Sequence, residues 1–278
     1  MRLDDQVLIA TVNVNGIRAA FRRGMAAWLD TRRPDVVLLQ ETRSGEEHLR
    51  DHLDTKVWDL AHAESATRGR AGVAIASRLP MRAVRVGLGQ GASNSGRWVE
   101  ADLELPGGDV LTVVSTYIHS GTLQTPSMAE KYVFLDLITA RLADLREGGG
   151  HVVVGGDVNI AHRDVDLKNW KGNLNAAGCL PAERAYLDRW FAAGWVDLGR
   201  RLGGEGPGPY TWWSWRGKAF DNDAGWRLDY QIATPGLAAR ARAATVDRAA
   251  SYAERFSDHA PLVVDYDLAR TTTSPDAG

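Results

Sequence analysis

Four short apolar runs, each bounded by polar residues, restrict the fold of this chain more than any other feature. They span residues 8–12, 36–39, 152–154 and 228–232. Runs of this length and composition are typical of buried strands. Sites in layered α/β proteins are commonly built from polar groups at strand ends, on loops that a rigid scaffold holds. From the residues alone we expect an α/β or α+β protein with its chemistry at the ends of these strands.

The polar residues associated with the four runs form one chemically consistent set. It consists of Asn13, Glu41, Asp157, Asn159, Asp229, Asp258 and His259. Oxygen ligands without cysteine suit Mg²⁺ or Mn²⁺ and suit Zn²⁺ poorly. A cation that few carboxylates hold leaves room for water and for phosphate oxygens. The implied chemistry is attack of an activated water on a phosphate ester.

The residue types suggest a division of roles within this set. Asn13, Glu41 and Asp258 are the candidate metal ligands, and Asp157 with Asn159 would orient the water or a second metal. Each residue also has a simpler interpretation. Asn13 would cap a helix that starts near residue 17, Glu41 would be a surface acid, and Asp157 with Asn159 would form an Asx turn.

The last two residues of the set, Asp258 and His259, precede an apolar segment at 262–264. Asp229 lies among apolar residues and needs a partner if it is buried. A carboxylate that accepts from one imidazole nitrogen fixes the tautomer, so Asp229 would steer His259 to stabilise or protonate phosphoryl oxygens. Such general acid–base help is typically worth ~10²–10⁴ in rate. The simpler interpretation of Asp258-His259 is a turn before a strand.

Six motifs in order give the chain a resemblance to a known family. They are Asn13-Val14-Asn15-Gly16-Ile17-Arg18, Gln40-Glu41-Thr42, Ser115-Thr116-Tyr117, Gly156-Asp157-Val158-Asn159-Ile160, Gly225-Trp226-Arg227-Leu228-Asp229-Tyr230 and Ser257-Asp258-His259. The chain resembles the exonuclease III family of DNA-repair nucleases, which includes abasic-site endonucleases and belongs to the endonuclease/exonuclease/phosphatase superfamily. The match runs from about residue 7 to residue 267.

The resemblance implies a fold and a domain organisation. The expected fold is an α/β (α+β) four-layer sandwich of the DNase I-like kind, with two packed mixed β-sheets flanked by helices. Residues on both sides of position 150 are needed for one site, so we expect a single domain over 1–268. Residues 269–278 are polar and predict a disordered tail.

The resemblance also implies site residues. The implied catalytic residues are Tyr117, Asp157, Asn159, Asp229 and His259, and the implied metal ligands are Asn13, Glu41, Asp157, Asn159 and Asp258. The implied substrate-binding residues are Asn15, Arg97, Ser120, Asn173, Trp212, Trp226, Arg227 and Leu228. Trp212, Trp226 and Leu228 would line the pocket for an abasic or terminal sugar, whereas Arg97 and Arg227 would contact phosphates or a groove. Ser120 stands where abasic-site endonucleases often carry Asn.

The expected activity is Mg²⁺-dependent (or Mn²⁺-dependent) cleavage of duplex DNA that carries abasic sites or damaged 3′ ends. The same scaffold in relatives also serves phosphoesterases that act on RNA, inositol phosphates or lipids, and a third alternative is a DNA-binding relative without catalysis. The balance between abasic-site cleavage, 3′-phosphate removal and 3′→5′ digestion stays open.

Bulk properties set the remaining expectations. The 278 residues carry a net charge of −2, which argues mildly against a nucleic-acid binder, although Arg18, Arg22 and Arg23 cluster after the first run. The single cysteine, Cys179, excludes an internal disulfide and suits a reducing cytoplasm. The first residues are polar and no apolar run approaches membrane-spanning length, so we expect a cytoplasmic monomer without a membrane anchor.

Periodicity predicts further elements. Strands are expected over 72–76, 97–103 and 110–114, with a turn at 106–109, and helices over 128–146 and from 181 to about 192. Strand alternation across 210–215 would place Trp213 and Trp215 on one face and Trp212 on the other. Cys179 is expected to be a small buried apolar residue.

Overall fold

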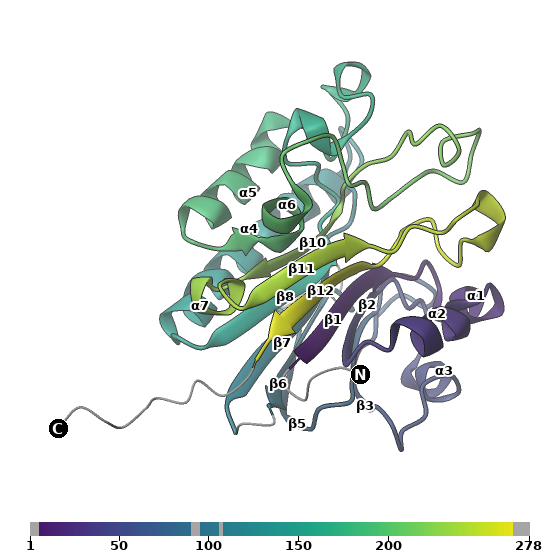
Figure 1. Ribbon diagram of the computed structural model, residues 1–278. Helices are drawn as coiled ribbons and strands as arrows, with labels where there is room; N and C mark the ends of the chain where they lie inside the picture. The colour runs from purple at the N-terminus through teal and green to yellow at the C-terminus, as the bar shows by residue number, and fades with distance from the viewer. Residues whose placement is uncertain (1–5, 90–94, 106–107, 269–278) are drawn as a thin grey trace.

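The computed structural model describes residues 6–89, 95–105 and 108–268. Its strands are β1 (Gln6–Asn13), β2 (Val36–Gln40), β3 (Asp59–Ala63), β4 (Val73–Ser77), β5 (Met81–Val86), β6 (Trp98–Glu104), β7 (Val110–Tyr117), β8 (His151–Asp157), β9 (Val196–Asp197), β10 (Asp229–Ala233), β11 (Ala241–Val246) and β12 (Leu262–Asp267). Its α-helices are α1 (Ile17–Arg22), α2 (Met25–Arg32), α3 (Glu46–Arg50), α4 (Pro126–Glu147), α5 (Pro181–Ala192), α6 (Leu198–Gly203) and α7 (Pro235–Ala238). Figure 1 shows their arrangement.

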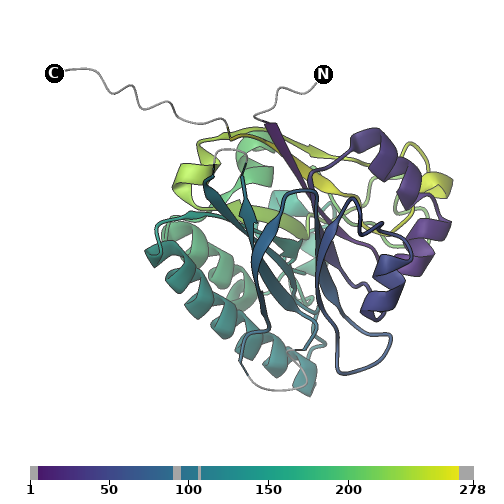
Figure 2. The ribbon, with the colours of Figure 1, turned by 90° about the horizontal axis from the view of Figure 1, so that it is seen from below.

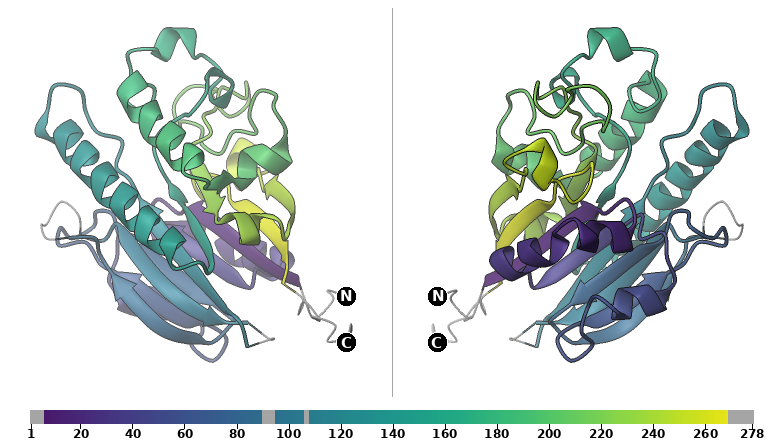
Figure 3. Two further views of the ribbon diagram at one scale, coloured as in Figure 1. Left: turned by 90° about the vertical axis from the view of Figure 1, so that its left-hand side faces the viewer. Right: turned by 90° about the vertical axis from the view of Figure 1, so that its right-hand side faces the viewer.

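The strands form two six-stranded mixed sheets that pack face to face. The first has the order β11-β12-β1-β2-β4-β3 and the second the order β5-β6-β7-β8-β10-β9. Helices α1–α3 cover the outer face of the first sheet, and α4 and α5 cover the outer face of the second (Figure 3). The predicted four-layer sandwich is confirmed.

The two sheets repeat one local topology. In the first, β1 is parallel to β2 and antiparallel to β12. In the second, β8 is parallel to β7 and antiparallel to β10. The ends of two parallel strands and the start of their antiparallel neighbour therefore lie at one edge in each sheet. Because β1 packs on β8 and β2 on β7, the two edges meet and bring six chain segments together.

The apolar runs are continuous because the central strands are buried on both faces. One core cluster, which includes Ile9, Leu38 and Val153, lies between the sheets. Others lie between the second sheet and α4 and α5, and between the first sheet and α1–α3. Figure 2 shows the layers of helices and strands between which these clusters lie. A strand covered on both sides carries apolar residues throughout and does not alternate.

Gly155 allows the sheets to approach closely at the centre of β8. A Cβ atom built on it would lie 2.5 Å from Leu38 Cδ1 and 3.2 Å from Thr11 Cβ, both on the opposite sheet. Any side chain at this position would push β8 away from β1 and β2. The absence of a side chain here thus sets the local spacing of the two sheets.

Several elements agree with the sequence patterns. The two helices predicted from periodicity are α4 and α5, and Gly148 follows the end of α4 as expected. The predicted strands correspond to β4, β6 and β7. Cys179 is 3% exposed, as expected for a small buried residue. The predicted tail at 269–278 and part of the predicted turn at 106–109 lie outside the described residues.

Other elements differ from expectation. The strand predicted through the tryptophan-rich segment is wrong, because only Trp212 makes isolated bridges there, to Trp226 and to His259. Strands β5 and β11 were not predicted, because at the edges of the sheets they are largely exposed and carry little apolar signal. Within the described ranges, no helix combines the length and apolar character that crossing a membrane requires.

Candidate active site

Asn13 and Asp157 join the two sheets at the edge where the parallel strands end. Asn13 is the last residue of β1 and Asp157 the last of β8. Asn13 Nδ2 donates to Asp157 Oδ2 at 2.9 Å and to Glu41 Oε1 at 2.8 Å. Asn13 is therefore the bridge between the carboxylate after β2 and the carboxylate of the opposite sheet.

Asp229 and His259 form a buried pair beside Asp157. Asp229 begins β10 and lies directly opposite Asp157 in the sheet. His259 Nδ1 lies 2.8 Å from Asp229 Oδ2, and Nε2 lies 3.7 Å from Asp157 Oδ2. The side chains of Asp157 and Asp229 are 1% and 0% exposed. The carboxylate of Asp229 thus fixes the imidazole so that its second nitrogen faces Asp157.

The electrostatics of this group follow from burial and from neighbouring charges. Burial raises the pKa of the Asp157 carboxyl, and His259 opposes this effect. Burial also disfavours a charged imidazole, but the carboxylates of Asp229 and Asp157 outweigh it and raise the pKa of His259 to about 10. At neutral pH the imidazole is therefore cationic in the metal-free protein, and Asp157 is prone to take up a proton.

Asp258 lies on the more open side of the site. Asn15 Nδ2 donates to Asp258 Oδ1 at 2.8 Å, and Trp212 Nε1 donates to Asp258 Oδ2 at 3.2 Å. Burial opposes ionisation of Asp258, but the His259 cation and these hydrogen bonds outweigh it and lower the pKa of the carboxyl. Asp258 is thus held as a carboxylate.

Glu41 has the exposure expected of a ligand to a hydrated cation. Its side chain is 14% exposed, and Arg43 pairs with it from the solvent side. Asp157, Asp229 and His259 are close enough together to hold an ion as well. Asp229 already holds the imidazole, however, so the partly open carboxylates of Glu41 and Asp258 fit a hydrated cation better. The oxygen-rich donors present, without a thiolate, fit Mg²⁺ or Mn²⁺.

Tyr117 and Asn159 lie next to Asp157. Tyr117 ends β7 and pairs with Asp157 across the parallel strands. Burial raises the pKa of Tyr117 well above its ordinary value, and Glu41 and Asp157 add to this effect, so the phenol keeps its proton. The guanidinium of Arg97 lies 5.2 Å from the centre of the Tyr117 ring. Asn159 Nδ2 donates to Asp157 Oδ2 at 2.9 Å.

The simpler interpretations of these residues are partly correct. Asn159 N donates to Asp157 Oδ1 at 3.0 Å, so the predicted Asx turn exists. The same turn also lets Asn159 Nδ2 donate to Asp157 Oδ2. The Asx turn is therefore part of the candidate active site. Asn13 does not cap the following helix, because Gly16 occupies the N-cap of α1 and no side chain caps it.

The expected sugar pocket involves residues at different depths. Trp212 and Trp226 are half-buried and meet edge to face, with ring centres 6.3 Å apart. Leu228 is 6% exposed. Trp212 also contacts Asp258, which connects these rings to the carboxylate cluster.

Arg227 is a correction to the sequence interpretation. Its side chain is 2% exposed and pairs with Asp166 at 2.8 Å and with Asp197 at 2.9 Å. A guanidinium enclosed in this way cannot contact a phosphate or a groove of DNA. Arg227 instead anchors the segment that carries Trp226 and Leu228.

Two further predicted substrate contacts lie outside the carboxylate cluster. Ser120 is exposed on the loop between β7 and α4. Asn173 is half-buried at the end of a short 3₁₀ turn, where its Nδ2 donates to the Asn169 carbonyl at 2.7 Å. Neither makes a hydrogen bond to the cluster.

Sequence reasoning missed three residues that hold the site together. Ser257 Oγ donates to the Asn13 carbonyl at 2.6 Å and accepts from His259 N at 3.2 Å. Thr211 Oγ1 accepts from Asp229 N at 3.1 Å. The third is Arg43, two residues after Glu41. Ser257 stood within a recognised motif, whereas nothing in the sequence marked the other two.

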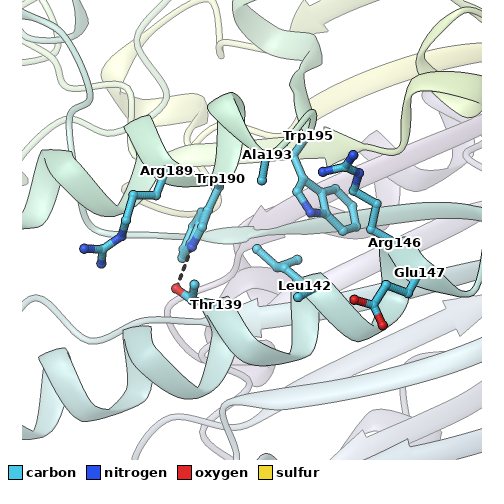
Figure 4. Close-up of a pocket in the computed structure, with 9 residues that line it drawn as sticks. Thr139, Leu142, Arg146, Glu147, Arg189, Trp190, Ala193 and Trp195 are labelled. Carbon is cyan, nitrogen blue, oxygen red and sulfur yellow. Dashed lines mark hydrogen bonds between the residues drawn. The ribbon is translucent and has the colours of Figure 1, made fainter.

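A cavity of about 340 Å³ lies elsewhere, between α4 and α5 (Figure 4). Its lining includes Leu142, Arg146, Arg189, Trp190 and Trp195. None of the carboxylates described above contributes to it, so it is separate from the candidate active site.

The layered fold and the carboxylate-rich edge define a hydrolase of the metal-dependent phosphoesterase class. The Endonuclease/Exonuclease/phosphatase family matches residues 10–259, and the chain belongs to this family. The exonuclease III resemblance seen in the motifs is confirmed by relatives. A DNA-(apurinic or apyrimidinic site) endonuclease from Dictyostelium discoideum is 27% identical and the alignment covers 95% of this chain and 72% of that protein. An exodeoxyribonuclease from Bacillus subtilis is 29% identical, with 90% and 95% covered.

A solved structure shows the same arrangement. The structure of the 3′ phosphatase NExo from Neisseria, bound to a product DNA hairpin, superposes with a TM-score of 0.83. It is 26% identical, and the alignment covers 94% of this chain and 99% of that one.

Proposed function

We propose that this protein is a Mg²⁺-dependent DNA-repair phosphodiesterase that acts on duplex DNA. It cuts 5′ to abasic sites, removes 3′-phosphates and digests from 3′ ends. The observation that carries this proposal is the buried group of Asp157, Asp229 and His259 beside the more open carboxylates Glu41 and Asp258. Relatives named for these activities, one of them bound to DNA, support the substrate class.

The proposed metal holders are Glu41 and Asp258, with Asn13, Asp157 and Asn159 completing the polar surroundings. When bound, Mg²⁺ (or Mn²⁺) supplies Lewis-acid stabilisation of phosphate oxygens. Two observations support this choice of metal holders: the side chain of Glu41 is partly exposed, and, against the effect of burial, the pKa of Asp258 is lowered, mainly by the neighbouring His259 cation.

Asp157 is the proposed acceptor of the proton from the attacking water. Burial raises the pKa of Asp157, so in the metal-loaded site, where it would be ionised, its carboxylate would be a stronger base than an exposed aspartate. Asn13 and Asn159 both donate to Asp157 Oδ2 and so fix its orientation. Asp157 Oδ1 accepts a hydrogen bond from the backbone amide of Asn159.

His259 is the proposed stabiliser of negative charge on the phosphoryl group. Its raised pKa keeps it cationic at neutral pH, and Asp229 holds its orientation. A fixed cation that faces developing charge acts through preorganised electrostatics. Tyr117, whose phenol keeps its proton, would donate a hydrogen bond to the same phosphate, with Arg97 beside its ring.

The half-buried rings of Trp212 and Trp226, with Leu228, would receive the abasic or terminal sugar. Asn15, Ser120 and Asn173 are proposed contacts to the DNA strand around that position. We further propose that the enzyme is a monomer, which light scattering on the purified protein would test. We also propose that it is cytoplasmic, which cell fractionation would test.

The decisive experiment compares three matched duplexes with Mg²⁺, which carry an internal abasic analogue, a 3′-phosphate or a plain recessed 3′ end. We expect turnover that EDTA abolishes and that His259→Ala lowers by ~10² or more with near-normal DNA affinity. A phosphoinositide and a single-stranded RNA are the counter-substrates. Faster turnover of either, or DNA binding without EDTA-sensitive cleavage, would replace the proposal.

A further inference from the structure

A fully buried ion pair lies behind the site, between α4 and α5, which run side by side over the second sheet (Figure 1). Lys131 Nζ lies 2.5 Å from Glu183 Oε1, and both side chains are 0% exposed. Neither residue belongs to the carboxylate cluster. Burying two charges is costly, so an ion pair in this position calls for a specific reason.

Lys131 is bound to the backbone of two loops that carry proposed site residues. Its Nζ donates to the Ser120 carbonyl and to the Asn159 carbonyl, both at 3.0 Å. Together with Glu183, these acceptors use all three hydrogens of the ammonium group. One cation on α4 thus fixes the loop that follows β7 and the loop that follows β8.

The contact to Asn159 matters because that residue has an unusual backbone conformation. Its φ angle is 52°, in the left-handed region that few residues other than glycine adopt and that asparagine tolerates best among them. In this conformation its side chain donates both to Asp157 and to the Ile118 carbonyl. Lys131 adds a constraint to this conformation by binding the carbonyl oxygen of Asn159.

Glu183 extends the same hold to a third loop. Its Oε2 accepts from Gly178 N at 2.7 Å and from Leu180 N at 3.1 Å. A Cβ atom on Gly178 would lie 2.9 Å from the Asn159 carbonyl oxygen and 3.4 Å from Trp226 Cζ3. The segment that Glu183 fixes is therefore packed against both Asn159 and Trp226.

We propose that Lys131 and Glu183 are positioning residues, which hold Asn159 in the conformation that orients Asp157 and so set the turnover rate. The inference rests on the proposed function. A pair of apolar side chains would fill the space between α4 and α5, but would leave two carbonyls and two amides of these loops without partners.

The test is the double variant Lys131→Met/Glu183→Gln. Methionine keeps the volume but cannot bind the two carbonyls, whereas the carboxamide oxygen of glutamine can still accept from Gly178 and Leu180. For the abasic duplex we expect kcat to fall ~10-fold or more, because small misplacements of catalytic groups are costly. KM and DNA affinity in EDTA should change much less than kcat, since among the proposed DNA contacts only Ser120 has a hydrogen bond to Lys131, and that bond is to its backbone carbonyl.

The matched control is Arg141→Met/Glu100→Gln, which removes the charge of another buried carboxylate, 2% exposed, together with its pairs to Arg141 of α4 and to Arg85 of β5. Arg141 and Glu100 hold α4 to β6, and their side-chain hydrogen bonds in the described part of the chain go to each other, to Arg85 and to Trp98, none of which is a proposed site residue. This control should lower the melting temperature while kcat per folded molecule is unchanged. Equal kcat in the Lys131/Glu183 variant and the parent, or a loss that matches only the unfolded fraction, overturns the positioning role. Absent turnover by the parent would instead refute the proposed function.

If the double variant does not fold, Gly178→Ala tests the same geometry without touching a charge. Its new Cβ would lie 2.9 Å from the Asn159 carbonyl oxygen, closer than an ordinary contact, and so would displace it. We expect a similar fall in kcat with DNA affinity retained. A folded Gly178→Ala protein with parental kcat would overturn the inference.

Discussion

The charge of Asp229 is predicted to keep His259 protonated, and Asp229→Asn tests this directly. The pKa of His259 is raised from 6.5 to about 10, mainly by Asp229 and Asp157 against the effect of burial. A pKa difference of roughly 3.5 corresponds to about 5 kcal/mol of extra stabilisation of the protonated imidazole relative to the neutral one. Asp229 is the nearer partner, at 2.8 Å against 3.7 Å for Asp157, and so accounts for the larger share. We expect the substitution to lower the pKa of His259 by about 2 or more.

The measurement is a proton NMR titration of the imidazole in metal-free protein. His259→Gln identifies the resonance among the seven histidines. In the parent protein the imidazole should stay cationic up to about pH 9, whereas in Asp229→Asn it should titrate near pH 8 or below. A variant pKa within about 0.5 of the parental value would refute the reasoning, because it would mean that Asp229 does not carry the interaction.

The same shift predicts how stability depends on pH. The folded-state pKa of His259 is raised above its unfolded value, so its contribution is fully present below about pH 6.5 and is lost as the pH rises towards about 10. Asp157 has a raised pKa as well and acts in the same direction. Urea midpoints of metal-free protein should therefore fall across this window, and less steeply in Asp229→Asn. Parallel curves for the two proteins would contradict the assignment.

Three further substitutions separate metal binding, stability and substrate binding. Glu41→Gln should weaken Mn²⁺ affinity by ~10-fold or more in calorimetry, because it removes a carboxylate from the open side of the site, and unchanged affinity would exclude Glu41 as a ligand. Arg227→Met should lower the free energy of unfolding by about 3–5 kcal/mol in urea titrations, since Asp166 and Asp197 both lose a buried cation and Asp166 keeps only Arg200; a loss below about 0.5 kcal/mol, as for an exposed pair, would show that these pairs are unimportant. Trp226→Ala should raise KM for the abasic duplex by ~10-fold with metal affinity unchanged, and parental KM would disprove the sugar pocket.

The positions of the polar residues were predictable because they are local to the apolar runs. Asn13 and Asp157 end strands whose continuous apolar sequence reflects burial on both faces, and Glu41 follows one directly. A polar residue at the end of such a run lies where the strand leaves the sheet, so the run alone predicts that this residue is at a sheet edge. The division of the strands between two sheets came from the family resemblance, because strand order depends on contacts between distant segments.

The errors have the same physical origin. Arg227 stands in a recognised motif next to Trp226, and its sequence neighbours do not reveal that Asp166 and Asp197 enclose it. The tryptophan-rich segment alternates like a strand, yet it lies as a loop beside Asp258, where the rings are fixed by contacts from other segments. Burial and pairing over long sequence distances decide such cases, and local patterns do not record them.

The missing side chain at Gly155 affects the candidate active site, which lies two residues further along β8 at Asp157. Asn13 and Asp157 belong to different layers, so their 2.9 Å contact is a measure of how far apart those layers stand. A methyl group at position 155 would act as a wedge two residues before Asp157 and would widen the gap without altering any reacting group. The distance between Asn13 and Asp157 in the candidate site therefore depends on the small volume of a residue in the core between the two sheets.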